Sequence, residues 1–190
     1  MIGVIMHIIS GKYKKMKLQT LDSSITRPTL TRIKEDMFNI ISNYFIFENK
    51  TSLDLFGGSG SLSIEGLSRG IKFAIINDLN KDANKIISFN LKKIPTSDYV
   101  LYQKDYLELL NLLKIQHQKV DLVYLDPPFK KIDYYYVVFD FLINNNLLND
   151  WAIIISETNK QLDLTKIKDL SLLKFKDYNK KYLYIFRLEK

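Results

Sequence analysis

The stretch TSLDLFGGSG, residues 51–60, decides the fold of this chain. Its first half is a short, largely apolar run that ends at 54–56, as a buried strand does. Glycines at 57, 58 and 60 then supply the backbone freedom that a tight turn needs before a helix, which we expect over 62–69. A strand, a glycine turn and a helix form the repeating unit of parallel α/β sheets.

Strand and helix patterns continue to alternate downstream of this unit. The predicted strands are KFAIIND at 72–78, YVLYQKD at 99–105, DLVYLD at 121–126 and WAIIISE at 151–157. Helices are predicted at 83–91, 106–113 and near 134–146. The tail from 169 to 189 alternates like an antiparallel pair that turns at 178–180. We therefore expect an α/β, Rossmann-like, doubly wound and mainly parallel seven-stranded sheet with an antiparallel C-terminal hairpin, which resembles the class I methyltransferase variant.

A smaller unit precedes this core. IMHIIS at 5–10 and MKLQT at 16–20 predict a β-hairpin around the polar turn GKYKK. A helix should follow, capped by Thr29 or Thr31 and apolar on one face from 33 to 44. We expect residues 1–48 to form an N-terminal extension and residues 49–190 the core, in one compact unit.

Composition limits the available functions. The chain has 190 residues, no cysteine and two histidines, so we expect no disulfide, no thiolate zinc site and no other metal centre. No stretch approaches the ~18 apolar residues that span a bilayer, and the first residues lack the basic start of a signal peptide. We expect a cytoplasmic protein with no membrane contact. It should be a monomer, because the predicted helices leave no apolar stripe uncovered.

Basic residues are concentrated near the N-terminus. The net charge is +7, and residues 11–34 contain seven basic residues against a single acid. Aromatic and turn residues are interleaved with them, which favours a phosphate-binding patch over the alternative of an ordinary solvated surface.

The glycine turn differs from two other nucleotide-binding turns. It lacks the third glycine of the dinucleotide pattern and the Gly-Lys-Ser/Thr of a P-loop. Its form D-x-F-x-G-x-G, with Phe56 as the aromatic residue, resembles the turn of S-adenosylmethionine enzymes. Gly58 and Gly60 would let the backbone approach the methionine part of the cofactor, and Asp54 would face its ammonium group. A plain tight turn remains the alternative.

Two further acids stand where a nucleoside would bind. Asp78 ends the strand at 72–78, where a carboxylate can accept hydrogen bonds from two ribose hydroxyls. Asp105 could accept from an adenine amino group, cap the helix that follows it, or do both. These acids indicate a nucleoside and do not by themselves indicate a methyl donor.

The motif DPPF, residues 126–129, indicates which reaction the protein catalyses. Aspartate, asparagine or serine followed by Pro-Pro and an aromatic residue is typical of S-adenosylmethionine enzymes that methylate exocyclic base amines. Such an amine is a poor nucleophile because the ring delocalises its lone pair. The Asp126 carboxylate and the Pro127 carbonyl can accept its hydrogens and stabilise the developing charge. Pro127 and Pro128 hold the acceptors rigidly, and Phe129 offers a face on which a flipped base can stack.

Four segments in order carry a family resemblance. HIISGKYKK at 7–15, RPTLTRIKEDMFNII at 27–41, LDLFGGSGSLSIEGLSRG at 53–70 and DPPF resemble the bacterial small-subunit ribosomal RNA guanine-N2 methyltransferases. The resemblance implies S-adenosylmethionine as methyl donor and, as target, the 2-amino group of the guanine at position 966 of 16S rRNA in the assembling small subunit. It also implies Met6 as the usual first residue.

The same resemblance assigns a role to the basic segment, and it also shows where this sequence departs from the family pattern. The residues expected to bind RNA phosphates are Lys12, Lys14, Lys15, Arg27 and Arg32. His7 replaces a common arginine and Asn80 replaces a common acid. Glu157 resembles an acidic family position, and we assign it no role, since a surface carboxylate is an equal alternative.

Two other functions remain open at this level. An adenine-N6 methyltransferase would use the same DPPF chemistry, although 190 residues leave little room for a separate target-recognition domain. A non-catalytic RNA-binding assembly factor would be expected to have lost Asp126 or the glycine turn, and both are intact. The assignment of guanine as the target base rests on the resemblance, because the sequence alone identifies no residue that recognises guanine.

Overall fold

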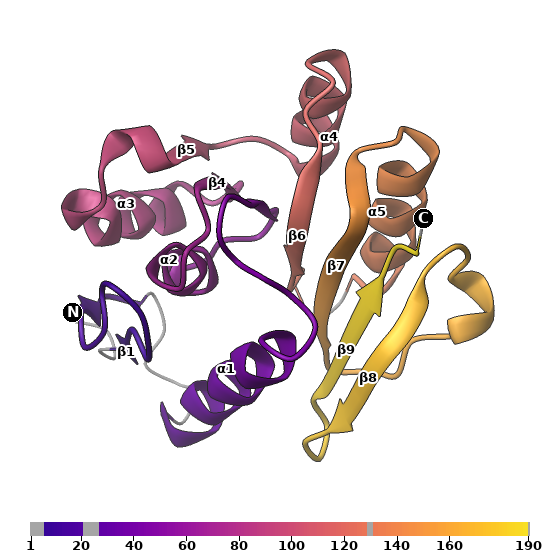
Figure 1. Ribbon diagram of the computed structural model, residues 1–190, viewed down its shortest axis with the longest axis horizontal. Coiled ribbons are helices and arrows are strands. Elements are labelled where there is room, and N and C mark those ends of the chain that lie inside the picture. The colour runs from indigo at the N-terminus through magenta and orange to yellow at the C-terminus, as the bar shows by residue number, and fades with distance from the viewer. Residues whose placement is uncertain (1–5, 21–26, 129–130, 190) are drawn as a thin grey trace.

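The computed structural model describes residues 6–20, 27–128 and 131–189, and the side chains of 27–31 lie outside that description. A seven-stranded sheet in the order β5-β4-β3-β6-β7-β9-β8 forms the middle layer (Figure 1). Strands β3 to β7 are parallel, and β9 is antiparallel to both β7 and β8. This confirms the predicted doubly wound sheet with its antiparallel hairpin. The strands are β3 Thr51–Asp54, β4 Phe73–Asn77, β5 Tyr99–Tyr102, β6 Val120–Leu125, β7 Leu148–Thr158, β8 Ser171–Asp177 and β9 Tyr182–Arg187.

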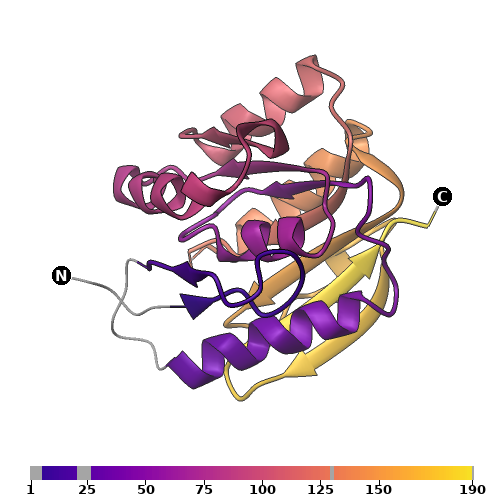
Figure 2. The same ribbon diagram turned by 60° about the vertical axis from the view of Figure 1, so that its left-hand side comes forward.

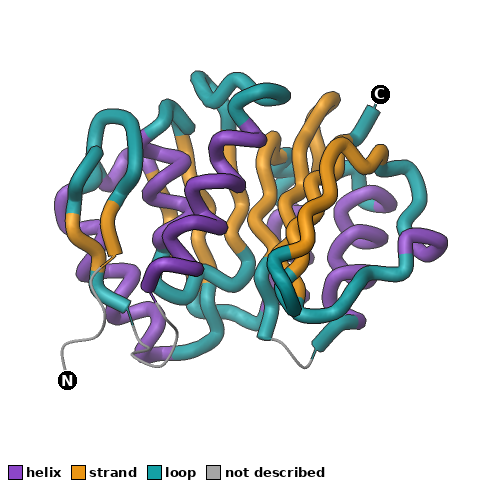
Figure 3. Tube along the Cα trace, turned by 90° about the horizontal axis from the view of Figure 1, so that it is seen from below, coloured by secondary structure: helices purple, strands orange, loops and turns teal. Residues whose placement is uncertain are grey.

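Helices cover both faces of this sheet (Figure 3). On one face lie α4 (Tyr106–Ile115) and α5 (Asp133–Asn144), whose apolar side chains share a core cluster with the sheet. On the other face lie α1 (Arg27–Ile41), α2 (Ser61–Ser68) and α3 (Lys81–Asn90), which form a second cluster. Every residue of β6 is buried, as expected for a central parallel strand that is covered on both faces. Three short 3₁₀ turns at 91–93, 96–98 and 164–166 complete the connections.

The N-terminal hairpin is present but shorter than predicted. Its strands, β1 (Met6–His7) and β2 (Lys17–Leu18), pair with each other and with no described strand of the main sheet. Ile8 and Leu18 are buried in the same cluster as α1 to α3, so the extension shares its core with the sheet. Figure 2 shows α1 lying alongside the β8–β9 hairpin.

The predicted cap of α1 was wrong. The helix begins at Arg27, so positions 29 and 31 lie inside it and not at its N-cap. Proline at 28 explains this start, because its fixed φ suits the first turn of a helix, where no N–H partner is needed.

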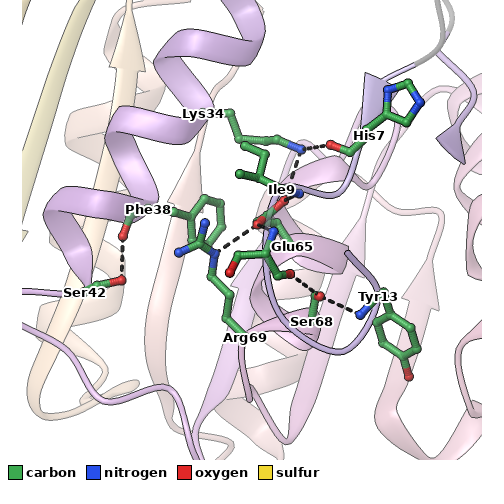
Figure 4. Close-up of polar contacts among 10 residues, drawn as sticks. His7, Ile9, Tyr13, Lys34, Phe38, Ser42, Glu65, Ser68 and Arg69 are labelled. Atoms are coloured by element: carbon green, nitrogen blue, oxygen red, sulfur yellow. Dashed lines mark hydrogen bonds and ion pairs between the residues drawn. The ribbon is translucent and has the colours of Figure 1, made fainter. Parts of the chain in front are cut away.

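A buried carboxylate fastens the extension to α2 (Figure 4). Glu65 is fully buried and accepts hydrogen bonds from the backbone N–H groups of Ile9 (2.8 Å) and Ser10 (3.1 Å). It also pairs with Lys34 Nζ at 3.3 Å and with Arg69 Nε at 2.9 Å. Lys34 was counted in the basic N-terminal segment, yet it is 3% exposed. It therefore belongs to the core and contributes nothing to a phosphate-binding surface.

Candidate active site

A cavity of about 640 Å³ opens at the carboxyl ends of the parallel strands. Strand order reverses between β3 and β6, because the chain passes from β3 outward through β4 to β5 and then returns to β6. Open α/β sheets bind ligands at such a reversal. Four loops supply the walls, one after each of β3, β4, β5 and β6. The lining residues are Leu55, Phe56, Gly58, Asn77, Asp78, Leu79, Asn80, Lys104, Asp105, Tyr106, Asp126, Pro127, Pro128, Lys131 and Tyr134.

The glycine turn forms one rim of this cavity. Gly58 has a φ of 57°, and a Cβ added to it would meet no atom within 4 Å. Since Gly58 lines the cavity, a side chain there would project into the space that a ligand needs. Gly60, the N-cap of α2, has a φ of 75° and does not line the cavity. An added Cβ there would come within 3.3 Å of Ile87. The role of Gly60 in the structure is to start α2 close against α3.

Asp54 lies beneath the turn and does not line the cavity. Its carboxylate is 3% exposed and accepts a hydrogen bond of 2.9 Å from the Ser63 hydroxyl. Burial raises the pKa of Asp54 to about 7, and Asp78 adds to the rise while the bonds from Ser63 and the Phe56 backbone oppose it. Its predicted contact with a ligand ammonium group stays a prediction.

Asp78 joins two walls of the cavity. Its Oδ2 accepts from the Gly58 backbone N–H and its Oδ1 from the Asn80 N–H, both at 2.8 Å. Each oxygen keeps a second lone pair for a ligand hydroxyl. Asn80, a departure from the family pattern, caps α3 by accepting from the backbone of Asp82 and Ala83.

Asp105 is the N-cap of α4, where its side chain accepts from the Leu107 N–H at 2.9 Å. The helix-capping alternative is thus present. Asp105 also lines the cavity, and its contact with adenine stays a prediction.

Asn77 is a buried residue that sequence reasoning missed. Its amide bonds to the backbone of Leu55 and Lys104 and so fixes the ends of β3, β4 and β5 relative to one another.

Three aromatic rings form an apolar wall. Phe56 lies 5.6 Å from Tyr106 and 6.1 Å from Tyr134 between ring centroids, and the two tyrosines are 4.5 Å apart. The Lys131 ammonium lies over Tyr134 at 5.6 Å. Tyr134 was not predicted as a site residue, although the run DYYYVV at 133–138 carries more aromatic side chains than one buried helix face can hold.

Asp126 directly follows β6 at the mouth of the cavity, and the buried Pro127 and the exposed Pro128 come next. Removal of hydration by the surrounding walls, and next the nearby Glu157 carboxylate, raise the pKa of Asp126 to about 8, while Lys181 lowers it. The side chain is still exposed toward the cavity, where water limits this rise without changing its direction. Phe129, the aromatic member of the motif, lies outside the described residues.

Glu157 is not a surface carboxylate. Its side chain is 12% exposed and forms an ion pair with Lys181, which lies just before β9. The Tyr135 hydroxyl of α5 donates a hydrogen bond to the Glu157 carbonyl. An acid at the end of a predicted strand is a weak signal, and it does not distinguish this position from a surface carboxylate.

The predicted RNA-binding residues lie at two ends of the molecule. Lys12 donates from its backbone to Ser68 at the end of α2, and its ammonium lies 3.4 Å from Asp98, which precedes β5. Both contacts are at the amino ends of the parallel strands, opposite Asp126. Lys14 and Lys15 are exposed in the same turn. Burial raises the pKa of the Tyr178 hydroxyl at the β8–β9 turn, and the charge of Arg32, which is exposed on α1, opposes this rise. The Arg27 side chain is not described.

Within 6–20, 27–128 and 131–189 there is no group of three or more potential ligands that could hold a metal ion. In that part of the chain no helix has the length and apolar composition needed to cross a bilayer.

Sheet order and cavity together define a protein of the class I methyltransferase fold, and similar solved structures agree. The Escherichia coli protein yhhF, described as a candidate methyltransferase, superposes with a TM-score of 0.82 over 98% of this chain and 99% of its own, at 23% identity. The Haemophilus influenzae protein HI0767 gives a TM-score of 0.77 over 98% of this chain and 100% of its own, at 30% identity.

The chain belongs to the family described as Conserved hypothetical protein 95, whose profile matches residues 6–187. One curated relative, the Ribosomal RNA small subunit methyltransferase D of Haemophilus influenzae, is 35% identical over 89% of this chain and 86% of its own length.

Proposed function

We propose that this protein is an S-adenosylmethionine-dependent methyltransferase that modifies the exocyclic N2 amine of a guanine in 16S rRNA, at position 966, during assembly of the small subunit. The observation that carries the proposal is Asp126, which projects from the end of β6 at the mouth of a cavity suited to a nucleoside. The curated relative named above as a ribosomal RNA small subunit methyltransferase supports the choice of RNA.

The cavity fits the methyl donor in four respects. Its volume lies within the range of small-molecule sites. Gly58 leaves open space where any other residue would place a side chain. Asp78 holds two carboxylate oxygens at the rim, and the rings of Phe56, Tyr106 and Tyr134 offer an apolar wall for a purine.

In the proposed methyl transfer, each residue of the motif that begins at Asp126 has a separate role. When bound, S-adenosylmethionine supplies a methyl group whose carbon–sulfur electrons stay on sulfur as the amine nitrogen bonds to carbon. Asp126 and the Pro127 carbonyl accept the amine hydrogens, which makes the nitrogen lone pair available and stabilises its developing positive charge. The amine must then lose one proton, and the ionised Asp126 carboxylate is the acceptor in reach. The double proline keeps both acceptors fixed.

Methyl transfer to three nucleic acids tests this proposal. The protein is incubated with labelled S-adenosylmethionine and unmodified small subunits, free 16S rRNA or duplex DNA, and modified bases are mapped by mass spectrometry. We expect N2-methylguanine at one position of the rRNA. Transfer to DNA alone would instead support an adenine methyltransferase, and binding of the cofactor without transfer would support a non-catalytic assembly factor.

A further inference from the structure

Three charged side chains line up beside the reacting position. Strands β6 and β7 are parallel, with Leu125 paired to Ser156, so Asp126, directly after β6, is a neighbour of Glu157, the last residue but one of β7. Tyr124 and Ile155, two residues earlier, are both buried in the cluster beneath α1 to α3. Because side chains alternate between faces along a strand, Asp126 and Glu157 lie on this same face.

The third member comes from the hairpin. Glu157 is paired with Leu183 of β9, which is also buried in that cluster. Lys181 precedes Leu183 by two residues, so its side chain lies on the same face, where it forms its ion pair with Glu157. A carboxylate, a second carboxylate and an ammonium therefore follow one another across the carboxyl edge of the sheet.

This row is held firmly. The Tyr135 hydroxyl fixes the Glu157 backbone to α5. The Asp36 carboxylate of α1 accepts from the Tyr178 hydroxyl at 2.9 Å and from Lys176 at 3.4 Å, which fixes the hairpin that carries Lys181. Side chains of Glu157 and Lys181 are 12% and 20% exposed, so both are partly desolvated. A pair in this position contributes little to stability, since desolvation offsets much of its attraction.

The order of these charges matches the base-pairing edge of guanine. That edge presents two donors and an acceptor in sequence, the N2 amine, N1–H and O6. Adenine presents the opposite groups, an acceptor at N1 and a donor at N6, and has no amine at C2. A row that accepts, accepts and donates is thus complementary to guanine and repels adenine.

We propose that Glu157 and Lys181 read the target base as guanine, with Glu157 accepting from N1–H and Lys181 donating to O6 while Asp126 accepts from the N2 amine. Lysine has three donor hydrogens, so Lys181 can contact O6 and keep its ion pair with Glu157. This inference rests on the proposed function and adds to it the residues that select the base.

A change of base at the target position tests the assignment. Small subunits are reconstituted from 16S rRNA in which ligation has placed guanine or 2,6-diaminopurine at the methylated position. 2,6-Diaminopurine keeps the 2-amino group but offers an acceptor at N1 and a donor at position 6. We expect the wild-type protein to prefer guanine by about 100-fold in kcat/KM. E157Q, whose amide can donate to N1, should lower this preference about 10-fold or more, and K181M should also lower it.

K174M is the matched control, because Lys174 lies on β8 of the same hairpin and its side chain is exposed to solvent. Its preference for guanine should equal that of the wild type. Binding of S-adenosylhomocysteine is measured for each variant, so that a misfolded protein is recognised and replaced in the comparison by the more conservative K181R or E157D.

The outcomes separate the two proposals. An unchanged preference in E157Q overturns the reading role, and so does an equal loss of turnover on both bases with normal cofactor binding, since that result would assign Glu157 to the support of Asp126. A wild-type protein that methylates no guanine refutes the proposed function itself.

Discussion

The backbone N–H of Gly58 donates a hydrogen bond of 2.8 Å to Oδ2 of Asp78, so the glycine turn after β3 and the acid after β4 form one structural unit. Asp78 both shapes the rim and offers its remaining lone pairs to a ligand. Substitution of Asp78 should consequently weaken binding of the methyl donor more than it lowers the stability of the protein.

We expect D78N to weaken binding of S-adenosylhomocysteine about 10-fold or more, because charge-assisted hydrogen bonds to ribose hydroxyls are lost. Isothermal titration calorimetry measures the change. D82N is the control, since Asp82 lies in the same segment but is exposed and paired with Lys85. Equal affinities for D78N and the wild type would remove Asp78 from the ligand site.

The pKa of Asp126 leads to a prediction for turnover. Since this pKa is raised, to about 8, and the ionised carboxylate is the better acceptor, kcat should rise with pH through a midpoint near 8 and level off only above it. D126N should be slower and should lack this rise, because its amide does not titrate. Single-turnover rates between pH 6 and 9 measure both. D126A should bind the cofactor nearly normally and lose most turnover, and a near-normal rate would contradict the assigned role.

Asp54 should make stability depend on pH. With its pKa raised to about 7, the folded protein keeps a proton between pH 4 and 7 that the unfolded chain has released. The free energy of unfolding should therefore fall as pH rises through this window, by up to about 4 kcal/mol from this group. Urea denaturation should show a steeper fall in the wild type than in D54N, because the contribution of Asp126 is common to both proteins. Parallel pH profiles would show that Asp54 ionises normally.

Loss of the buried Glu65 charge should release the N-terminal extension. E65Q leaves Lys34 buried without its counter-ion, which should cost about 3–5 kcal/mol of unfolding free energy. Hydrogen exchange should also accelerate at Ile9 and Ser10, whose N–H groups bond to Glu65. K34M should cost less, because Glu65 keeps Arg69 and both backbone donors. Equal losses in the two variants would contradict this division.

Neutralisation of basic residues should reveal how far RNA extends over the surface. K14A/K15A removes two exposed charges at the amino ends of the strands, and R32A removes one near the β8–β9 turn. Each phosphate contact that is lost should reduce the slope of log affinity against log salt by about one. Filter binding at several salt concentrations measures the slopes. If only R32A flattens the slope, RNA contacts the carboxyl edge alone, and the hairpin turn at 11–15 leaves the proposed RNA-binding set.

Local chemistry explains which parts of the site were predictable. Gly58, Asp78, Asp105 and Asp126 each follow a strand whose apolar pattern is visible in the sequence, and parallel strands bring such positions to one edge. Tyr134 escaped prediction because the aromatic run at 133–138 does not show which of its tyrosines leaves the core. Asn77 escaped prediction because an asparagine in a strand has no distinctive local pattern. Their roles come from neighbours on other strands and helices.

The sequence by itself determined the doubly wound sheet, the turn at 54–60 and the acceptor motif at 126–129, because periodicity, glycine and proline act through the local backbone. Only the tertiary structure decided that Lys34 is buried against Glu65, that the basic segment is divided between two ends of the sheet, and that Glu157 and Lys181 follow Asp126 in one row. These relationships depend on strand register and on contacts between residues far apart in the chain, and no local pattern records such contacts.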